Sequence, residues 1–350
     1  MKACLFYGPE DLRYEEIEKP VLQDGEILVK VNAALTGGTD VKTYLNGHPR
    51  IIKKTPSSFG YEFSGQIVDL GPGITNFRYG DRVISANTAP CGECFHCQRN
   101  ELSLCENLDF LNGSFAEFIK IPAAIVKKNF YKMPVALDFH EAAMAQTLAV
   151  CLHGYRRTDI KVNDNVVVYG LGPIGQTFIK ILKSSIGHRD TKVIALGRSE
   201  IKRKLAKKNG ADYVLDTSDK DFKKEFKKIC PRGADKVIEA TGSMEVWEDT
   251  FNLVRRGGLI NFFGGCPKGK KIKVDTYKLH YDEVRTIGVF HHTPEFIKEA
   301  LDLLGTKKID MKDLITHEMP LEKLEDALKL MIKGEAMKVL IRDPDASHPV

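Results

Sequence analysis

The sequence reads Asn165-Val-Val-Val-Tyr-Gly170-Leu-Gly172-Pro-Ile-Gly175 near its middle, an apolar run that breaks into glycines and then opens a helix. The three valines form a continuous β-branched run, which suits a parallel strand covered on both faces. Apolar residues then recur at helical spacing, at Ile174, Phe178, Ile181 and Leu182. This order of strand, turn and helix is the context that a glycine-rich phosphate turn requires.

Each glycine of this turn has its own role in binding a dinucleotide. Gly170 permits a tight turn, Gly172 lets the backbone approach a pyrophosphate, and Gly175 lets the helix pack close to the strand. The helix N-terminus presents unpaired N–H groups to the anion. The pattern therefore favours a dinucleotide-binding unit over a plain glycine turn, and the candidate binding residues are Gly170, Leu171, Gly172, Pro173, Ile174 and Gly175.

The next predicted strand, 192–196, ends at the position that selects the cofactor. A unit that binds NAD usually has Asp or Glu there to hold the ribose 2′-hydroxyl. This chain has Gly197 instead, followed by Arg198 and Ser199, so a 2′-phosphate would meet a guanidinium and a hydroxyl. We expect NADP(H) to be preferred over NAD(H), with Arg203 also near the phosphate. The alternative is that these basic residues are ordinary solvated charges on the next helix.

Composition sets the broad class of the protein. The chain has 350 residues, 43% of them hydrophobic and 28% charged, with a formal net charge of +5. This length suits two domains, and no apolar run is long enough for a membrane span. The N-terminus lacks signal-peptide anatomy, so a cytoplasmic location is expected. The lysine-rich segments 202–208 and 220–228 alternate with apolar residues, which favours solvated helix faces over nucleic-acid binding.

The organisation of the chain changes twice. Residues 1–150 contain short predicted strands, at 27–31, 63–70, 82–85 and 115–121, separated by turn residues. Residues 151–288 alternate strand and helix, which predicts an α/β fold with a doubly wound parallel sheet. One of those helices is expected to end at Arg256, before Gly257. Residues 289–350 add two amphipathic helices and a strand at 338–341, which we place back against the β-rich domain.

Four of the eight cysteines form the cluster Cys91-x-x-Cys94-x-x-Cys97 with a later return at Cys105. In a cytosolic chain such a cluster favours metal binding over disulfides. Four thiolates at this spacing suit a closed tetrahedral zinc site that clips a lobe at 88–108 and leaves no open position for substrate. An iron–sulfur cluster is the alternative, although its usual spacing differs.

These features together resemble the zinc-containing medium-chain alcohol and polyol dehydrogenases, of the sorbitol and threonine dehydrogenase type. The resemblance covers the chain from Met1 to about Asp343 and includes the four-cysteine lobe, the segment 60–65, the turn 80–83 and the glycine turn. It implies a Rossmann domain inserted into a β-rich GroES-like catalytic domain, and a homodimer or homotetramer. It also implies reversible hydride transfer between an alcohol and a ketone or aldehyde, with Thr241 and Gly242 near the cofactor.

The chain departs from this family at the catalytic metal. The family holds one zinc with a cysteine in Cys-Gly-[Ser/Thr]-Asp, a histidine in Gly-His-Glu, and a nearby acid or cysteine. The matching positions here are Gly37, Tyr61 and Gln146, and Glu62 alone survives. One oxygen donor cannot hold zinc, so we expect the usual catalytic zinc to be absent. The alternative is a rebuilt site in which His153, His291 or His292 joins Glu62.

Another group must then stabilise the oxyanion that develops as hydride arrives. Thr39 matches the family's proton-relay hydroxyl, and Lys42 replaces the outer histidine of the relay. We hypothesise that Tyr61 or His291 is the general acid, with Thr39 and Lys42 relaying the proton and Glu62 orienting them. A nearby cation such as Lys42 is expected to lower the pKa of Tyr61. The alternative is that Tyr61 fills a disused pocket.

Three functional classes remain open at this point. The first, which we favour, is an NADP(H)-dependent oxidoreductase acting on a small molecule that is a secondary alcohol, a polyol or the corresponding ketone. The second is a zinc-independent reductase of an activated carbon–carbon double bond. The third is a non-catalytic dinucleotide-binding protein, against which the intact glycine turn and the retained Thr39, Asp40 and Glu62 argue.

Overall fold

The computed structural model describes residues 1–187 and 190–342, so residues 343–350 of the expected catalytic domain lie outside the described part. The chain forms two compact units. Unit 1 comprises Met1–Ala149 and His292–Val350, and unit 2 comprises Val150–His291. Within residues 1–187 and 190–342, no helix has the length and apolar character needed to cross a membrane.

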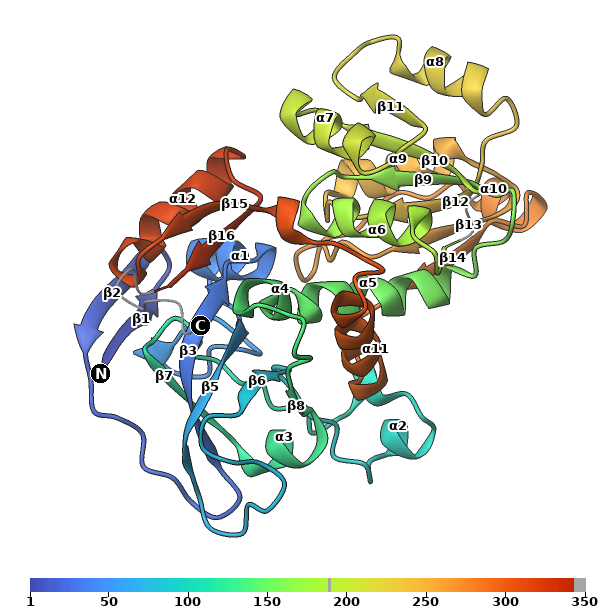
Figure 1. The fold of residues 1–350 in the computed structure, drawn as a ribbon. Coiled ribbons are helices and arrows are strands. Elements are labelled where there is room, and N and C mark those ends of the chain that lie inside the picture. Colours follow the sequence, from blue (N-terminus) through green and yellow to red (C-terminus); the bar gives the residue numbers. More distant parts are fainter. Residues whose placement is uncertain (188–189, 343–350) are drawn as a thin grey trace. The chain divides into compact units, whose positions relative to one another are not determined.

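Unit 2 is built on a six-stranded parallel sheet in the order β11-β10-β9-β12-β13-β14 (Figure 1). The order reverses between β9 and β12, and in such sheets ligands bind beside the carboxyl ends of the strands at this reversal. The predicted doubly wound sheet is therefore confirmed. The strands are β9 (Asn165–Tyr169), β10 (Lys192–Gly197), β11 (Tyr213–Asp216), β12 (Ala234–Glu239), β13 (Val254–Phe262) and β14 (Arg285–Gly288).

Helices pack on this sheet and bury its central strands. Val167, Ile194, Val237 and Ile260 are fully buried in its core, as expected for strands covered on both faces. The helices are α6 (Pro173–Lys183), α7 (Glu200–Lys208), α8 (Phe222–Ile229), α9 (Met244–Leu253), α10 (Thr276–Tyr281) and the larger part of α5 (Ala145–Thr158).

One predicted boundary in this unit is wrong. The helix expected to reach Arg256 ends at Leu253, and β13 begins at Val254. Val254 pairs with Ala234, and the register shifts before Leu259 pairs with Lys236. Gly257 adopts a positive φ of 67° inside this irregularity, so the glycines lie at a bulge in the strand and do not stop a helix.

Unit 1 contains the β-rich part of the chain. Its larger sheet has the order β15-β16-β3-β5-β6-β8, with β7 also paired to β3, and a smaller sheet has the order β2-β1-β4. The strands are β1 (Lys2–Gly8), β2 (Asp11–Glu16), β3 (Ile27–Leu35), β4 (Ser57–Ser58), β5 (Glu62–Leu70), β6 (Arg82–Ser85), β7 (Phe118–Ile121), β8 (Phe130–Lys132), β15 (Ile315–Met319) and β16 (Lys338–Ile341).

Two strand predictions in unit 1 had wrong ends. β3 continues to Leu35, four residues beyond the predicted strand, because its second half pairs with β5. The strand expected from Phe115 begins only at Phe118; Phe115 instead donates its N–H to the carbonyl of Phe59, outside the strands. Backbone hydrogen bonds to distant segments therefore determine where these two strands begin and end.

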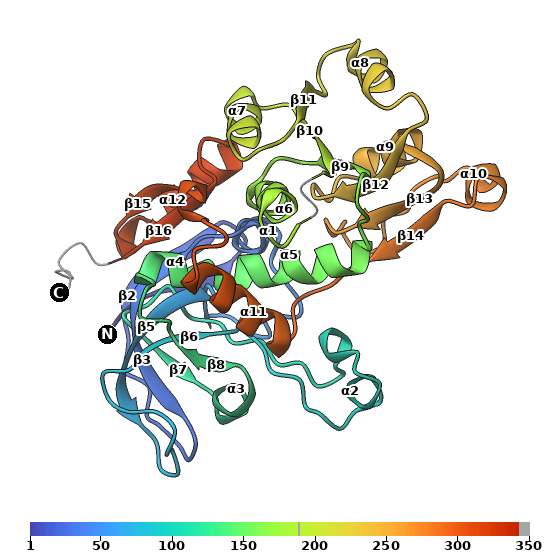
Figure 2. The same cartoon turned by 45° about the vertical axis from the view of Figure 1, so that its right-hand side comes forward.

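The C-terminal segment pairs with the large sheet of unit 1. β16 runs antiparallel to β3, where Leu340 faces Leu35, and parallel to β15 (Figure 2). This pairing places Lys338, at the start of β16, beside the end of β3. The helices of this unit are α1 (Gly38–Asn46), α2 (Phe95–Gln98), α3 (Ala123–Lys128), α4 (Phe139–Ala143), α11 (Pro294–Gly305) and α12 (Leu324–Lys333).

Candidate active site

The glycine turn between β9 and α6 has the geometry that a pyrophosphate site requires. Gly170 has a φ of 103°, in the region that favours glycine. A Cβ at Gly175 would lie 1.8 Å from the carbonyl oxygen of Gly170, so no larger residue fits there. A Cβ at Gly172 would meet nothing within 4 Å, so the backbone is open to a ligand at this point. The residues present fit a dinucleotide phosphate.

A second turn follows β12, at the carboxyl edge of the same sheet. The carboxylate of Glu239, which is fully buried, accepts hydrogen bonds from the N–H groups of Thr241 at 2.6 Å and Gly242 at 3.0 Å. Burial raises the pKa of Glu239, and the hydrogen bonds from Thr241 oppose that shift. Glu239 therefore fixes the turn that contains two candidate cofactor residues.

The residues after β10 differ in whether their side chains are exposed or contact the protein. Arg198 is exposed and Ser199 is half-buried at the start of α7. Arg203 instead turns back to the chain: its guanidinium donates to the carbonyl groups of Gly197 and Arg198 and pairs with Asp216 at 2.8 Å. Arg203 therefore holds the end of β10 in place, and Arg198 is the exposed cationic side chain at this point.

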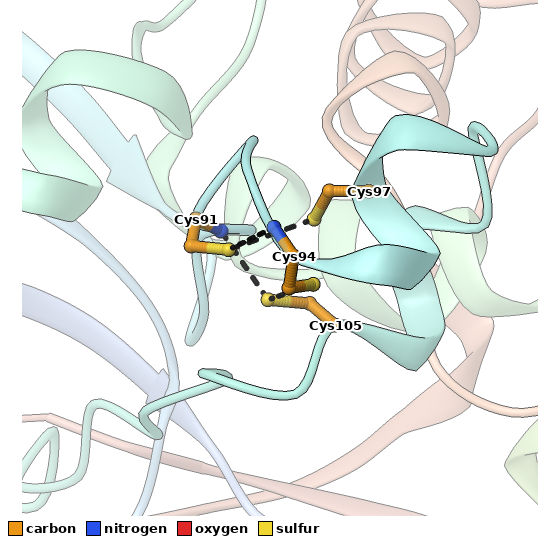
Figure 3. A group of neighbouring side chains, drawn as sticks. All are labelled: Cys91, Cys94, Cys97 and Cys105. Carbon is orange, nitrogen blue, oxygen red and sulfur yellow. Dashed lines mark hydrogen bonds between the residues drawn. The ribbon is translucent and has the colours of Figure 1, made fainter.

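The four clustered cysteines converge as predicted (Figure 3). Their sulfur atoms all lie within 4.8 Å of one another, and the Cys91–Cys97 and Cys94–Cys105 sulfur pairs are each 3.9 Å apart. A tetrahedral zinc with Zn–S bonds of about 2.3 Å needs sulfur atoms about 3.8 Å apart. The cluster therefore fits a structural zinc, which would hold all four thiolates and supply no open position for chemistry.

Two cysteines of this cluster have opposite environments. Backbone N–H groups of Glu93 and Cys94 lower the pKa of Cys91 to about 6. Burial raises the pKa of Cys97 to about 12. All four cysteines are deprotonated together when a divalent cation binds them, because the metal stabilises the thiolate form.

The candidate catalytic residues of unit 1 lie at the start of α1 and the adjacent start of β5. Gly37 precedes α1, and its N–H donates to the Oδ2 atom of Asp40 at 2.7 Å in a capping box. Thr39 is half-buried and hydrogen-bonds through its side chain to Tyr61. Lys42, on the same helix, is exposed. The structure thus brings Thr39, Asp40 and Tyr61 together and places Lys42 at the surface.

The predicted fall in the pKa of Tyr61 is wrong. Burial, followed by the charges of Asp40 and Glu62, raises the pKa of Tyr61 well above its ordinary value, and a hydrogen bond with Thr39 opposes this only in part. Tyr61 is 9% exposed, and the charges that act on it are negative. The phenol therefore stays protonated at neutral pH and can donate a hydrogen bond.

Glu62 forms a buried ion pair that the sequence alone did not indicate. Its Oε2 atom lies 2.6 Å from the ammonium of Lys338 and accepts a hydrogen bond from the hydroxyl of Thr147 at 2.7 Å. The same ammonium donates to the carbonyl oxygen of Thr36 at 3.1 Å. Lys338 is 1% exposed. This Glu62 oxygen is therefore committed to a fixed cation of the protein.

The positions that match the family's catalytic zinc ligands hold Gly37, Tyr61 and Gln146. A Cβ at Gly37, where the family has its cysteine, would lie 2.8 Å from the Oε1 atom of Glu62 and 3.4 Å from the Oδ2 atom of Asp40. Tyr61 offers a protonated phenol at the histidine position, and Gln146 has a buried amide oxygen with no hydrogen-bond partner in the described residues. Within residues 1–187 and 190–342, the four-cysteine cluster is the one metal-ligand group of three or more His, Cys, Asp or Glu residues.

Each of the three histidines considered as alternatives has its own surroundings. His153 donates from its Nδ1 atom to the carbonyl oxygen of His291 at 2.8 Å, within unit 2. Burial, followed by His153, lowers the pKa of His291 to about 3, so its imidazole is neutral near pH 7. His292 belongs to unit 1, where its Nε2 atom lies 3.1 Å from the amide oxygen of Asn87.

Sequence reasoning missed two features of this site, the burial of Asp40 and the presence of Lys338. Lys338 lies 276 residues from Glu62 in the chain. The sequence feature that could have identified it is a lysine at the start of a short strand whose other residues are apolar. Asp40 stands in the family motif Gly37–Asp40, but nothing in that motif shows that its carboxyl group is buried.

Comparison with known proteins places the chain in a family. Residues 23–133 match the family model of the alcohol dehydrogenase GroES-like domain, and residues 173–306 match that of zinc-binding dehydrogenases. The chain is 33% identical to a sorbitol dehydrogenase of Halalkalibacterium halodurans over 94% of this chain and 95% of the relative. It is 30% identical to an L-threonine 3-dehydrogenase of Pyrococcus horikoshii over 97% of each.

A solved structure agrees with these matches. A protein from Sinorhizobium meliloti 1021, assigned to the zinc-binding dehydrogenases and bound to NADP, superposes with a TM-score of 0.88 at 28% identity, covering 98% of this chain and 99% of that one. These matches cover both units of the fold described above. The chain therefore belongs to the zinc-binding medium-chain dehydrogenase family and is a medium-chain alcohol or polyol dehydrogenase.

Proposed function

We propose that this enzyme transfers hydride between NADP(H) and a small polyol or secondary alcohol, or the corresponding ketone, without a catalytic zinc. The observation that supports this most directly is the pairing of Glu62 with Lys338, beside a protonated Tyr61. In this proposal, charged groups and hydrogen-bond donors of the protein take the place of the family's zinc ligands. The two relatives named above act, by their names, on sorbitol and L-threonine, which supports a hydroxylated small substrate.

The residues divide the work of the reaction as follows. The glycine turn and the Thr241–Gly242 turn of unit 2 would hold the dinucleotide, whose nicotinamide would supply the hydride. Tyr61 and Thr39 donate hydrogen bonds to the substrate oxygen as negative charge develops on it. Glu62, fixed by Lys338, orients these groups. His291 is neutral near pH 7 and supplies no proton. Lys42, which is exposed, relays protons between the site and solvent.

Metal content tests the proposed absence of a catalytic zinc. Protein purified without added zinc is expected to contain close to one zinc per chain, since the four cysteines form one closed site. The variant Cys91→Ser is expected to lose that zinc, and Cys266→Ser, outside the cluster, to retain it. Two zinc ions per chain, one of them surviving in Cys91→Ser, would contradict the proposal and indicate a rebuilt catalytic site.

A substrate screen separates the remaining functional classes. NADPH oxidation with ketoses is expected to be faster than with conjugated enones, and the corresponding polyols are expected to support reduction of NADP+. Turnover of enones alone would favour a double-bond reductase. Binding of NADPH without turnover of either class would favour a non-catalytic protein.

The preference for NADP(H) rests on Arg198 and can be tested there. Arg198→Ala is expected to lower kcat/KM for NADPH about ten- to a hundredfold relative to NADH, because a charge-assisted hydrogen bond contributes about 1.5–3 kcal/mol. The control is Lys204→Ala on the same helix, whose ammonium is exposed and paired with Glu200. An unchanged ratio in Arg198→Ala would show that this side chain does not contact the phosphate. The expected homo-oligomer and cytoplasmic location stay predictions.

A further inference from the structure

Three ionisable groups are buried around Gly37 in unit 1, and their charges do not sum to zero when all three are ionised. The two carboxyl groups belong to Asp40, on α1, and Glu62, on β5, and they are 2% and 6% exposed. The single cation is Lys338, on β16. If both carboxyl groups were ionised, the cluster would carry a net negative charge in a site with little water, which is costly.

The geometry assigns the ion pair to Glu62 and leaves Asp40 as the carboxyl group without a cation. Lys338 lies 2.6 Å from Glu62, whereas the carboxyl group of Asp40 accepts a hydrogen bond from the N–H of Gly37. The Oδ2 atom of Asp40 and the Oε1 atom of Glu62 both lie near the Cβ position of Gly37, at 3.4 Å and 2.8 Å. They are therefore within about 6 Å of each other, the range in which one negative charge opposes a second.

We propose that Asp40 holds the proton that ketone reduction consumes and takes back the proton that alcohol oxidation releases. This inference rests on the proposed function and assigns the proton to a residue that the family resemblance did not indicate. Asp40 does not touch the substrate. It acts through Tyr61 and Thr39, whose hydroxyl groups are hydrogen-bonded to each other, and Thr39 is its neighbour in the chain.

The step balances in atoms and charge. During reduction, hydride adds to the carbonyl carbon, the C=O π electrons move to oxygen, and that oxygen takes a proton from the hydroxyl pair of Tyr61 and Thr39. The carboxylic acid of Asp40 returns a proton to that pair and becomes a carboxylate, which solvent later protonates. Oxidation runs the same steps in reverse.

Other groups of the site are less suited to this role. Tyr61 has a pKa far above neutral and His291 a pKa of about 3, so neither changes charge near pH 7. Burial, followed by the charge of Glu62, raises the pKa of Asp40 to about 7, while the Gly37 N–H and Lys338 lower it. An acid–base group is most effective when its pKa lies near the working pH.

Infrared spectroscopy of the full chain, without substrate or cofactor, tests where the proton is. A carboxylic acid C=O band is expected at pH 6, is expected to disappear as pH rises through about 7, and should be missing in Asp40→Asn. The amide side chain of this variant would retain an oxygen to accept from Gly37, so the capping box is kept. The control is Asp326→Asn, an exposed carboxylate on α12 whose replacement should leave the band unchanged. A band that persists in Asp40→Asn would overturn the assignment.

The pH profile of kcat/KM tests whether the proton is used. Wild-type ketone reduction is expected to fall as pH rises through about 7, because the protonated acid is then lost. Asp40→Asn should be about a hundredfold slower at pH 6 and lack this limb. If Asp40→Asn does not fold, Glu62→Gln should shift the limb to lower pH, since it removes a negative charge beside Asp40. A limb unmoved by both variants contradicts the proposal. An enzyme inactive with all substrates, but with the infrared band intact, contradicts the proposed function instead.

Discussion

Tyr61→Phe is expected to lower kcat for ketone reduction by about 10²–10³, the typical effect of removing one oxyanion donor. The substitution deletes the hydroxyl that hydrogen-bonds to Thr39 and keeps the ring in its buried position. Because burial and the neighbouring carboxyl groups keep the phenol protonated, Tyr61 contributes a hydrogen bond to the oxyanion, and the proton is replaced from Asp40. Steady-state kinetics with a ketose and NADPH provide the measurement.

The affinity for NADPH is expected to stay unchanged in this variant, since all candidate dinucleotide contacts lie in unit 2. Tyr44→Phe is the matched control, because Tyr44 is also a buried tyrosine of unit 1 and its hydroxyl donates to Glu325 at 2.6 Å. Tyr44→Phe should leave kcat within a few-fold of wild type. If Tyr61→Phe turns over at the wild-type rate, Tyr61 only fills space.

Features encoded locally could be predicted from the sequence. The glycine turn lies between β9 and α6 as expected, because the valine run and the helical periodicity are contiguous with it. The four cysteines converge because two short Cys-x-x-Cys steps confine their sulfur atoms. The end of α9 was predicted wrongly because the pairing of Val254 with Ala234 outweighed a local helix-stop signal.

The electrostatics of the active site could not be predicted, because they depend on contacts between distant segments. Lys42 was expected to act on Tyr61 because it takes the place of the outer histidine of the family's proton relay, but it is exposed on α1, and the charges near Tyr61 are those of Asp40 and Glu62. Lys338 reaches Glu62 only because β16 pairs with β3, which itself pairs with β5. No periodicity or motif in the sequence specifies that juxtaposition.

Lys338→Met is expected to destabilise unit 1 by about 3–5 kcal/mol, because it leaves the buried carboxylate of Glu62 without its cation. For a unit of this size, that loss corresponds to a fall in Tm of roughly 10 °C. The single tryptophan, Trp247, lies in unit 2, so its fluorescence does not report on this change. Hydrogen exchange of the β3 and β16 amides reads unit 1 directly.

A double-mutant cycle with Glu62→Gln separates the ion pair from general packing. Lys338→Met in the Glu62→Gln background should cost about 2–3 kcal/mol less than in the wild type, because no buried charge is then left alone. The exposed pair Lys53–Asp109, 2.7 Å apart in the same unit, is the control, and Lys53→Met should change stability by less than about 0.5 kcal/mol. Additive effects of the two substitutions at the buried pair would mean that Lys338 stabilises unit 1 through its aliphatic chain alone, and that Glu62 is held by Thr147 without the help of a cation.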